Sequence, residues 1–280
     1  MRAMDYREYP APAGLAGHVE CLWRLSQERP AAAPQTIYPD GRCELVVHLG
    51  SPPRCWDAVR GWHVQARTLF AAQRVVAVRL EATGPLDCIG VRLRPAVSNA
   101  LWRGAGASHR DQVVDLAALD AGFSRALARA ARRFARGNPE TLWTLLAKRC
   151  AEVPVDARMS TAIERLERDR GRSRIESLAR TAALSMRGFQ VRFRAAVGLT
   201  PKEFARLTRL QSTLRALDAT DTKLSELASD GGFADQAHAT RELRRVTGHT
   251  PARLRTELRR DRDGDAAVRL AAAFVRGYAA

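Results

Sequence analysis

Side chains that can form hydrogen bonds with nucleic acid recur at helical spacing between residues 186 and 194. A glutamine amide can form two hydrogen bonds with adenine, and an arginine guanidinium can form two with the O6 and N7 atoms of guanine. The same side chains could instead be the solvated polar face of a helical bundle. The positions expected to face outward are Met186, Arg187, Gln190, Val191 and Arg194.

A second segment about fifty residues further along the chain carries a similar set. Its outward positions are predicted to contact base edges, whereas Arg244 and Arg245 are better suited to phosphate, which supports affinity without reading sequence. Two copies in the same order favour a DNA-reading role over a merely solvated face. The outward positions of this second set are Gln236, Ala237, Thr240 and Arg241.

Apolar residues show which elements must hold these side chains. Phe189, Phe193 and Val197 recur at i, i+4 and i+8, so they predict the buried stripe of a helix over residues 186–197. A shorter helical segment and a tight turn precede that helix. The corresponding segments of the second copy are a short helix and a turn followed by a helix over 236–247. This order is that of a helix-turn-helix unit.

The pattern Gly-x-Thr-Pro ends both copies, at residues 198–201 and 248–251. Thr200 and Thr250 can cap the next helix, and proline fits the first helical turn, where its missing N–H costs nothing. Seven short helices are predicted between residues 160 and 261. Ser160 is expected to cap the first of them, and Ser173 with Glu176 has the spacing of a capping box.

The first half of the chain differs from the second. Strands are predicted over residues 19–25, 43–49, 75–80 and 88–93, and the pattern becomes helical from about residue 112. The expected fold class is α+β: a small N-terminal β-barrel or cupin-like domain with helices, then an all-α domain of two helix-turn-helix units joined by a long helix. Residues 152–156 are the predicted linker. The resulting domains are 1–155, 156–262 and a C-terminal tail, 263–280.

Composition narrows the class of protein. The formal net charge of +16, from 46 Lys and Arg against 30 Asp and Glu, favours a polyanionic partner. The five cysteines form no Cys-x-x-Cys pair, which argues for a reducing compartment and against a zinc site. No signal-peptide core and no membrane-spanning apolar run is present, so a cytoplasmic protein without membrane contact is expected. No catalytic triad, metal site or cofactor site is predicted.

The second half resembles the AraC/XylS transcriptional regulators of bacteria. The resemblance covers about residues 158–258 and is carried by Gly232-Phe233-Ala234-Asp235-Gln236-Ala237-His238, Arg241, Arg244-Arg245, Gly248, Thr250-Pro251 and Arg255. It implies that a long helix over 201–217 presents two recognition helices to successive major-groove segments of double-stranded DNA. It also implies RNA polymerase as a partner. The family's base-facing positions fall on Arg187, Gln190 and Val191, and on Gln236, Ala237, Thr240 and Arg241.

Some residues depart from the family pattern. Ala239 and Leu243 stand where larger apolar residues are usual, so looser packing of the second unit is expected. Arg192 takes a position that is usually apolar; it either extends past its neighbours or marks a rotated helix. His238 is interpreted as a packing and hydrogen-bonding residue.

The first half resembles, more weakly, an uncharacterised domain that precedes this DNA-binding module in some members of the family. Residues 38–46 and 89–95 carry the resemblance. It implies a role in sensing a small-molecule effector or in forming a homodimer. A pocket could be lined by Tyr38, Glu44, His48, Trp56, Trp62 and His63, although core packing or surface placement is the alternative.

Three hypotheses follow for function. The first is a sequence-specific transcription regulator, not an enzyme, whose N-terminal domain controls two helix-turn-helix units. The second is a non-specific nucleic-acid-binding or architectural protein. The third makes the N-terminal domain a cysteine-dependent repair enzyme, against which the lack of a cysteine cluster counts.

Overall fold

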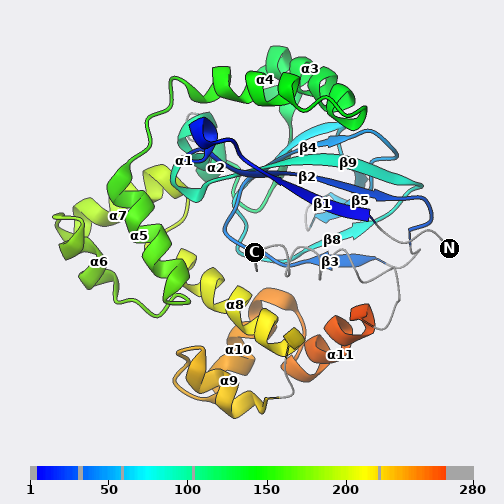
Figure 1. The fold of residues 1–280 in the computed structure, drawn as a ribbon. Coiled ribbons are helices and arrows are strands. Elements are labelled where there is room, and N and C mark those ends of the chain that lie inside the picture. Colours follow the sequence, from blue (N-terminus) through cyan, green and yellow to red (C-terminus); the bar gives the residue numbers. More distant parts are fainter. Residues whose placement is uncertain (1–4, 31–33, 58–59, 103–104, 220–221, 263–280) are drawn as a thin grey trace.

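The computed structural model describes residues 5–30, 34–57, 60–102, 105–219 and 222–262. In the described chain every strand lies before residue 116, and all the elements after it are helices (Figure 1). The prediction of an α+β chain with a β-rich N-terminal part and a helical C-terminal part is therefore confirmed. The predicted tail over residues 263–280 lies outside the described residues.

Six strands form the larger sheet, in the order β1-β2-β9-β4-β7-β10, and every neighbouring pair is antiparallel. Central strands β2 and β9 are the longest, which suits their burial on both faces. The strands are β1 (Asp5–Pro10), β2 (Val19–Gln27), β4 (Glu44–His48), β7 (Thr68–Ala71), β9 (Leu86–Leu93) and β10 (Val113–Asp115).

Four shorter strands form a second antiparallel sheet in the order β3-β8-β5-β6. In the described part of the chain no strand pairing joins it to the larger sheet, so the expected closed barrel is wrong. The two sheets lie face to face instead, with β3 and β8 below the larger sheet in Figure 1. These strands are β3 (Gln35–Ile37), β5 (Arg54–Asp57), β6 (Gly61–Val64) and β8 (Val78–Glu81).

Two predicted boundaries shift for local reasons. The strand expected from residue 75 begins at Val78, because the backbone N–H groups of Val75 and Val76 donate to the Asp111 carboxylate instead of a neighbouring strand. The helical pattern expected from residue 112 begins at Leu116, after β10 has paired with β7. Asp115 caps that helix by accepting from the N–H of Ala117.

Helices α3 and α4 cover one face of the larger sheet (Figure 1). Leu45, Phe70 and Val91 point toward these helices, whereas Trp23, Val46 and Leu69 point toward the smaller sheet, as the period-two alternation of strands requires. The helical elements of this half are η1 (Ala13–Leu15), α1 (Pro95–Ser98), η2 (Ala100–Trp102), α2 (Ala105–Ser108), α3 (Leu116–Ala135) and α4 (Glu140–Cys150).

Seven helices of the described chain follow residue 156, and both Gly-x-Thr-Pro patterns restart a helix as predicted. The Thr200 hydroxyl accepts from the N–H of Glu203, and that of Thr250 accepts from the N–H of Arg253. The seven helices are α5 (Ala157–Arg168), α6 (Ile175–Thr181), α7 (Met186–Val197), α8 (Pro201–Ala219), α9 (Leu224–Asp230), α10 (Gln236–Thr247) and α11 (Pro251–Arg262).

Two predicted caps in this half are wrong. Asp156, rather than Ser160, caps α5, because its carboxylate reaches the N–H groups of Arg158 and Met159. No capping box forms at Ser173, since its hydroxyl donates to the Asp169 carboxylate, and α6 begins without a side-chain cap. The Ser173 hydroxyl is thus bound to Asp169, four residues earlier in the chain, and does not cap α6.

A buried ion cluster links three strands of the larger sheet. The Arg92 guanidinium donates to Glu44 at 3.0 Å and to Glu8 at 2.8 Å, and the Trp23 indole N–H donates to Glu44 at 3.1 Å. Burial raises the pKa of the Glu44 carboxyl to about 7, although the Arg92 charge opposes the rise. The buried Arg92 guanidinium therefore forms ion pairs with two carboxylates, those of Glu8 and Glu44.

Replacing Gly90 by alanine should destabilise the N-terminal half. A Cβ there would lie 1.9 Å from Cε2 of Trp23, so the indole would have to leave the position in which it meets Glu44. We expect a loss of about 1–3 kcal/mol in the free energy of unfolding, as for other overpacked sites. Urea titration of Gly90→Ala measures it, with Gly14→Ala as the control, because a Cβ at Gly14 meets nothing within 4 Å. Equal stabilities of the two variants would contradict this packing.

The Glu44 carboxyl should make stability fall as pH rises. Its folded-state pKa of about 7 exceeds its ordinary value of 4.5, so its stabilising contribution is complete below pH 4.5 and lost as pH rises through 7. The unfolding free energy of the native protein relative to Glu44→Gln should fall by up to about 3 kcal/mol over that window. Denaturant titrations at several pH values measure this difference.

His48 titrates in the same window with the opposite sign, since burial lowers its pKa to about 4. It is present in both proteins and cancels in the comparison. A difference between the native protein and Glu44→Gln that stays constant from pH 4.5 to 8 would show that Glu44 keeps an ordinary pKa.

Candidate nucleic-acid interface and inter-sheet cavity

The first helix-turn-helix unit consists of α6 and α7. Ser185 caps α7 by accepting from the N–H of Gly188 at 3.1 Å, and Gly198 ends the helix in the left-handed conformation. Phe189 and Phe193 are fully buried, and the Phe193 ring meets that of Phe204 on α8 at a centroid distance of 5.8 Å. The predicted buried stripe therefore fixes the rotation of α7.

The opposite face of α7 lies in solvent, as predicted. Val191 is 62% exposed, and the guanidinium of Arg192 reaches the Asp156 carboxylate at 3.8 Å. Arg192 thus lies at the surface beside the start of α5, and no rotation of the helix is needed to place it. Met186 is only half-buried and touches the core, unlike its exposed neighbours. The exposed predicted positions on α7 are Arg187, Gln190, Val191 and Arg194.

The second unit consists of α9 and α10, and α10 has the predicted bounds, 236–247. Asp235 caps α10 by accepting from the N–H of His238 at 2.6 Å. The His238 ring accepts from the N–H of Ala234 and packs edge-on against Phe233, which confirms its packing and hydrogen-bonding role. Ala239 is fully buried, so the smaller side chain does not open the unit to solvent.

Most of the predicted side chains on α10 are exposed. Thr240 is half-buried, and its hydroxyl donates to the carbonyl of Gln236 at 2.9 Å. Arg245 forms an ion pair with Glu242 at 3.3 Å, and Glu242 also faces Arg206 of α8 at 3.8 Å. The exposed predicted positions are Gln236, Ala237, Arg241, Arg244 and Arg245.

Helix α8 joins the two units. Thr200 and Glu203 form a reciprocal capping box at its start, with the Glu203 carboxylate accepting from the N–H of Thr200 at 2.9 Å. Apolar side chains from Phe204 to Leu217 are buried in one cluster that also contains residues of both units. Each unit is therefore packed against the same helix, with α6 and α7 at the left of Figure 1 and α9 and α10 at the bottom.

The β-rich half contacts the C-terminal ends of α7 and α10 at equivalent positions. The N–H of Asn99 donates to the carbonyl of Ala196 at 3.2 Å, and the N–H of Ala77 donates to the carbonyl of Val246 at the same distance. Ala196 and Val246 are fifty residues apart, which is the repeat distance of the two units. The Asn99 amide also donates to the carbonyl of Ala195 at 2.7 Å.

Further contacts hold the β-rich half on α8 and α5. The Gln211 amide donates to the carbonyl of Pro39 at 2.8 Å, and Arg42 forms an ion pair with Glu167 of α5 at 2.7 Å. A Cβ at Gly41 would meet the Phe204 ring at 2.9 Å, which shows how closely this loop approaches α8. No local sequence signal identifies these partners, because each pair is far apart in the chain.

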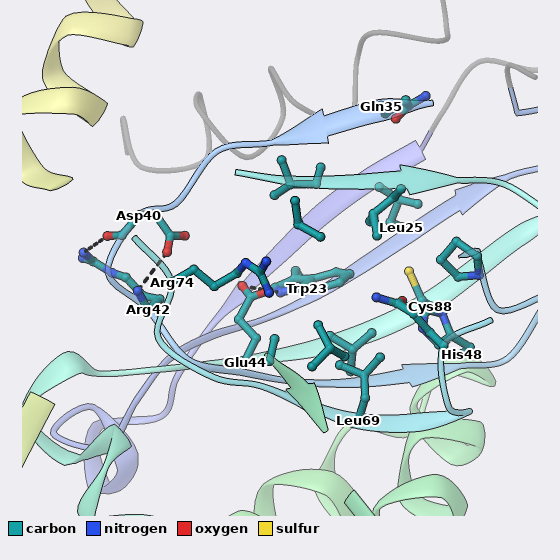
Figure 2. A pocket seen from close by; sticks show the side chains of 18 of the residues that line it. Trp23, Leu25, Gln35, Asp40, Arg42, Glu44, His48, Leu69, Arg74 and Cys88 are labelled. Atoms are coloured by element: carbon teal, nitrogen blue, oxygen red, sulfur yellow. Dashed lines mark hydrogen bonds between the residues drawn. The ribbon is translucent and has the colours of Figure 1, made fainter. Parts of the chain in front are cut away.

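A cavity of about 150 Å³ lies between the two sheets and is mostly apolar (Figure 2). Three of the six predicted pocket residues line it: Tyr38, Glu44 and His48. Trp56, Trp62 and His63 do not, because they lie on the hairpin of β5 and β6, where the two indoles pack edge to face. The apolar lining includes Trp23, Leu25, Ile37, Val46, Leu69, Val78, Leu80 and Cys88.

Few polar groups reach this cavity. The Gln65 amide oxygen lies 3.2 Å from Nε2 of His48, and burial lowers the pKa of that imidazole to about 4, so it is neutral at neutral pH. Arg74 extends from the segment between β7 and β8 into the same space (Figure 2). Sequence reasoning missed Arg74, which stands in no motif.

The cysteines are unsuited to nucleophilic chemistry. All five are buried and unpaired with one another, and burial raises the pKa of Cys43 and of Cys88 to about 12. In the described ranges no group of acidic, cysteine or histidine side chains could hold a metal ion. Among the same residues, no helix is long and apolar enough to cross a membrane.

Solved structures of transcription regulators are similar to parts or most of this chain. ToxT from Vibrio cholerae covers 91% of this chain and 98% of its own, at 7% identity and a TM-score of 0.46. The DNA-binding domain of AdpA was solved in complex with a target DNA. Its match covers 38% of this chain and 96% of that domain, at 28% identity and a TM-score of 0.35. The match to a transcriptional regulator with an AraC-type DNA-binding domain from Chromobacterium violaceum covers 36% of this chain and 91% of that chain, at 19% identity and a TM-score of 0.34.

Two family models match the sequence. A helix-turn-helix domain matches residues 178–257, and a domain of unknown function, DUF6597, matches residues 7–115. No curated protein matches the chain. The helix-turn-helix match spans both units described above, and the second match covers both sheets. The C-terminal part of the chain therefore matches a helix-turn-helix domain family, and its N-terminal part matches the DUF6597 domain family.

Proposed function

We propose that the protein binds double-stranded DNA sequence-specifically and reads it with two recognition helices, α7 and α10. Residues 156–262 are the DNA-binding domain, residues 1–155 are a domain that controls it through an effector or through dimerisation, and residues 263–280 are a tail. The resemblance to AraC/XylS regulators also brings RNA polymerase as a proposed partner. The protein is proposed to have no catalytic activity of its own.

One observation carries this proposal most. Both α7 and α10 bury an apolar stripe and turn a face of glutamine and arginine toward solvent, and each is capped by a side chain at the preceding turn. A recognition helix in the major groove needs such a free polar face on a fixed support. The proposed base-reading residues are Arg187, Gln190 and Val191 in α7, and Gln236, Ala237, Thr240 and Arg241 in α10, with Met186 and Arg194 flanking the first set.

The alternative is a non-specific or architectural nucleic-acid-binding protein. The net charge of +16 favours it, because backbone phosphate attraction alone supports non-specific affinity. Selection of binding sites from a random pool of duplex DNA separates the two functions. An enriched motif with two half-sites about one helical turn apart supports specific reading, whereas no enrichment supports the alternative.

Removal of one reading side chain should reduce sequence preference. Loss of a bidentate base contact costs about 1–3 kcal/mol of discrimination, so Gln190→Ala and Arg241→Ala should each lower the ratio of specific to non-specific affinity about 5- to 150-fold. Competition binding with selected and scrambled duplexes measures this ratio. Gln112→Ala and Arg132→Ala are matched controls, because both side chains are exposed on the β-rich half. Unchanged preference in Gln190→Ala and Arg241→Ala would show that the reading residues are assigned wrongly.

Removal of a phosphate contact should weaken binding to all DNA sequences by the same factor. Arg244 is exposed near the end of α10, and Arg244→Ala should lower affinity for selected and scrambled duplexes by the same factor. The slope of log affinity against log salt concentration should fall by about 1. Titrations at several salt concentrations test this, again with Arg132→Ala as the control. A change in the preferred sequence would place Arg244 on a base instead.

A further inference from the structure

Arg74 is a cation without a partner in the inter-sheet cavity. Its Nε–H is buried and donates to no partner, and no ion pair or hydrogen bond involves its guanidinium in the described part of the chain. Burial lowers its pKa, and Asp111, Cys55 and Asp57 oppose this. The Arg74 side chain is half-buried and forms no ion pair in the described part of the chain, so its charge is available to pair with an incoming anion.

The other charged groups at the cavity already have partners. The Asp40 carboxylate accepts from the backbone N–H of Arg42 at 2.8 Å. Glu44 is bound by Arg92 and by the Trp23 indole. Arg42 lies between the carboxylates of Glu20 and Glu167, at 2.9 and 2.7 Å. His48 is neutral, since burial lowers its pKa to about 4. The charge left to recognise an incoming molecule is therefore positive.

Size and lining limit what the cavity can hold. Its volume of about 150 Å³ is bounded mainly by Trp23, Leu25, Val46 and Leu69. An apolar protein cavity of about 150 Å³ accommodates a benzene-sized molecule. The matching ligand has an apolar body close to a benzene ring in size, and its negative group lies at Arg74.

The segment that carries Arg74 also contacts the second recognition helix. Three residues after Arg74, the N–H of Ala77 donates to the carbonyl of Val246 near the end of α10. Val75 and Ala77 pack against the helical core, while Val78 again lines the cavity. A cleft bordered by Val76, Ala77 and Val246 lies beside this contact, so the contact is not locked by surrounding side chains.

We propose that the inter-sheet cavity binds a small apolar carboxylate through Arg74, and that residues 74–77 transmit its binding to α10 through the Ala77–Val246 hydrogen bond. The ligand and DNA then bind to one protein with a shared coupling free energy. By reciprocity, each changes the affinity for the other by the same factor. The coupling to DNA rests on the proposed DNA-reading function, whereas the binding of a carboxylate does not.

The binding half is tested on the full chain with a panel of probes. Benzoate, cyclohexanecarboxylate, phenylacetate and octanoate are compared with their uncharged carboxamides by calorimetry and by thermal denaturation. At least one carboxylate should saturate the protein below about 10 mM and raise its Tm, and its amide should bind at least tenfold more weakly. Failure of every carboxylate to saturate, or equal binding of acid and amide, would overturn the proposal.

Two variants and a control assign the charge. Arg74→Gln should lose tenfold or more in carboxylate affinity, and Arg74→Lys should retain part of it, because the charge remains. Arg79→Gln is the control, since Arg79 is exposed on β8 and does not line the cavity. Arg74→Gln removes an unpaired cation, so it should be at least as stable as the native protein without ligand. Equal carboxylate affinity in Arg74→Gln and Arg79→Gln would overturn the assignment.

The coupling half is tested with Ala77→Pro, which removes the donor to Val246. A saturating carboxylate should change the affinity of the native protein for selected DNA about fivefold or more, and DNA should change the carboxylate affinity by the same factor. Ala77→Pro should bind the carboxylate as the native protein does, which also shows that its cavity is folded, but should lose the effect on DNA. Loss of carboxylate binding in Ala77→Pro, or an undiminished effect on DNA, would overturn the proposed connection.

Failure of this proposal is distinguishable from failure of the proposed function. If the protein selects a DNA motif but no carboxylate binds, the cavity proposal is wrong and sequence-specific reading stands. If no motif is selected while a carboxylate binds through Arg74, the reading function is wrong and the cavity assignment stands.

Discussion

The backbone carbonyls at the ends of α7 and α10 are the groups on which the arrangement of this protein depends. The last four carbonyls of any helix have no partner within it. Here the β-rich half supplies donors to the same carbonyl of each recognition helix, from Asn99 to Ala196 and from Ala77 to Val246. Because a hydrogen bond to backbone is short and directional, the two helices are positioned against one common body. The spacing of the two polar faces thus depends on the N-terminal half as well as on α8.

Helix α8 alone would not hold the units so firmly. Its charged and polar contacts with the β-rich half are made at Gln211, which reaches the Pro39 carbonyl, and at Glu203, which pairs with Arg110 at 2.7 Å. The loop that carries Pro39 also borders the inter-sheet cavity. Two separate segments, this loop and the one after β7, therefore lie between the cavity and the DNA-binding half. Two backbone segments thus connect the cavity lining to the helices: the loop with Pro39 contacts α8, and residues 74–77 contact α10.

Local signals were sufficient for the helical half and insufficient for the β-rich half. The bounds of α7, α9 and α10 follow from the apolar period and from caps such as Ser185 and Asp235, which act within a few residues. The four predicted strands correspond to β2, β4, β8 and β9, whereas the other strands of the described chain were not predicted. The open pair of sheets was not predicted either, because closure depends on which edge strands pair. Asn99 and Arg74 were missed since their roles depend on partners or empty space that distant segments create. Ser160 and Ser173 show the limit of short patterns, because Asp156 caps α5 in place of Ser160, and the Ser173 hydroxyl donates to Asp169 and leaves α6 without a side-chain cap.

The partition of charge explains why the protein tolerates an unpaired guanidinium in its interior. Arg92 and Arg42 are each shared between two carboxylates, so the cations of the larger sheet are compensated where they lie. Arg74 forms no ion pair in the described part of the chain. Asp111, Asp57 and Cys55 act on its charge from further away, and the Asp111 carboxylate also accepts from the N–H groups of Val75 and Val76. Those two hydrogen bonds hold the segment in place while leaving the guanidinium in the cavity. The anchored backbone therefore keeps the Arg74 guanidinium in the cavity. Under the proposal above, pairing this guanidinium with a bound anion lowers its free energy, and that gain is available to shift the position of Ala77.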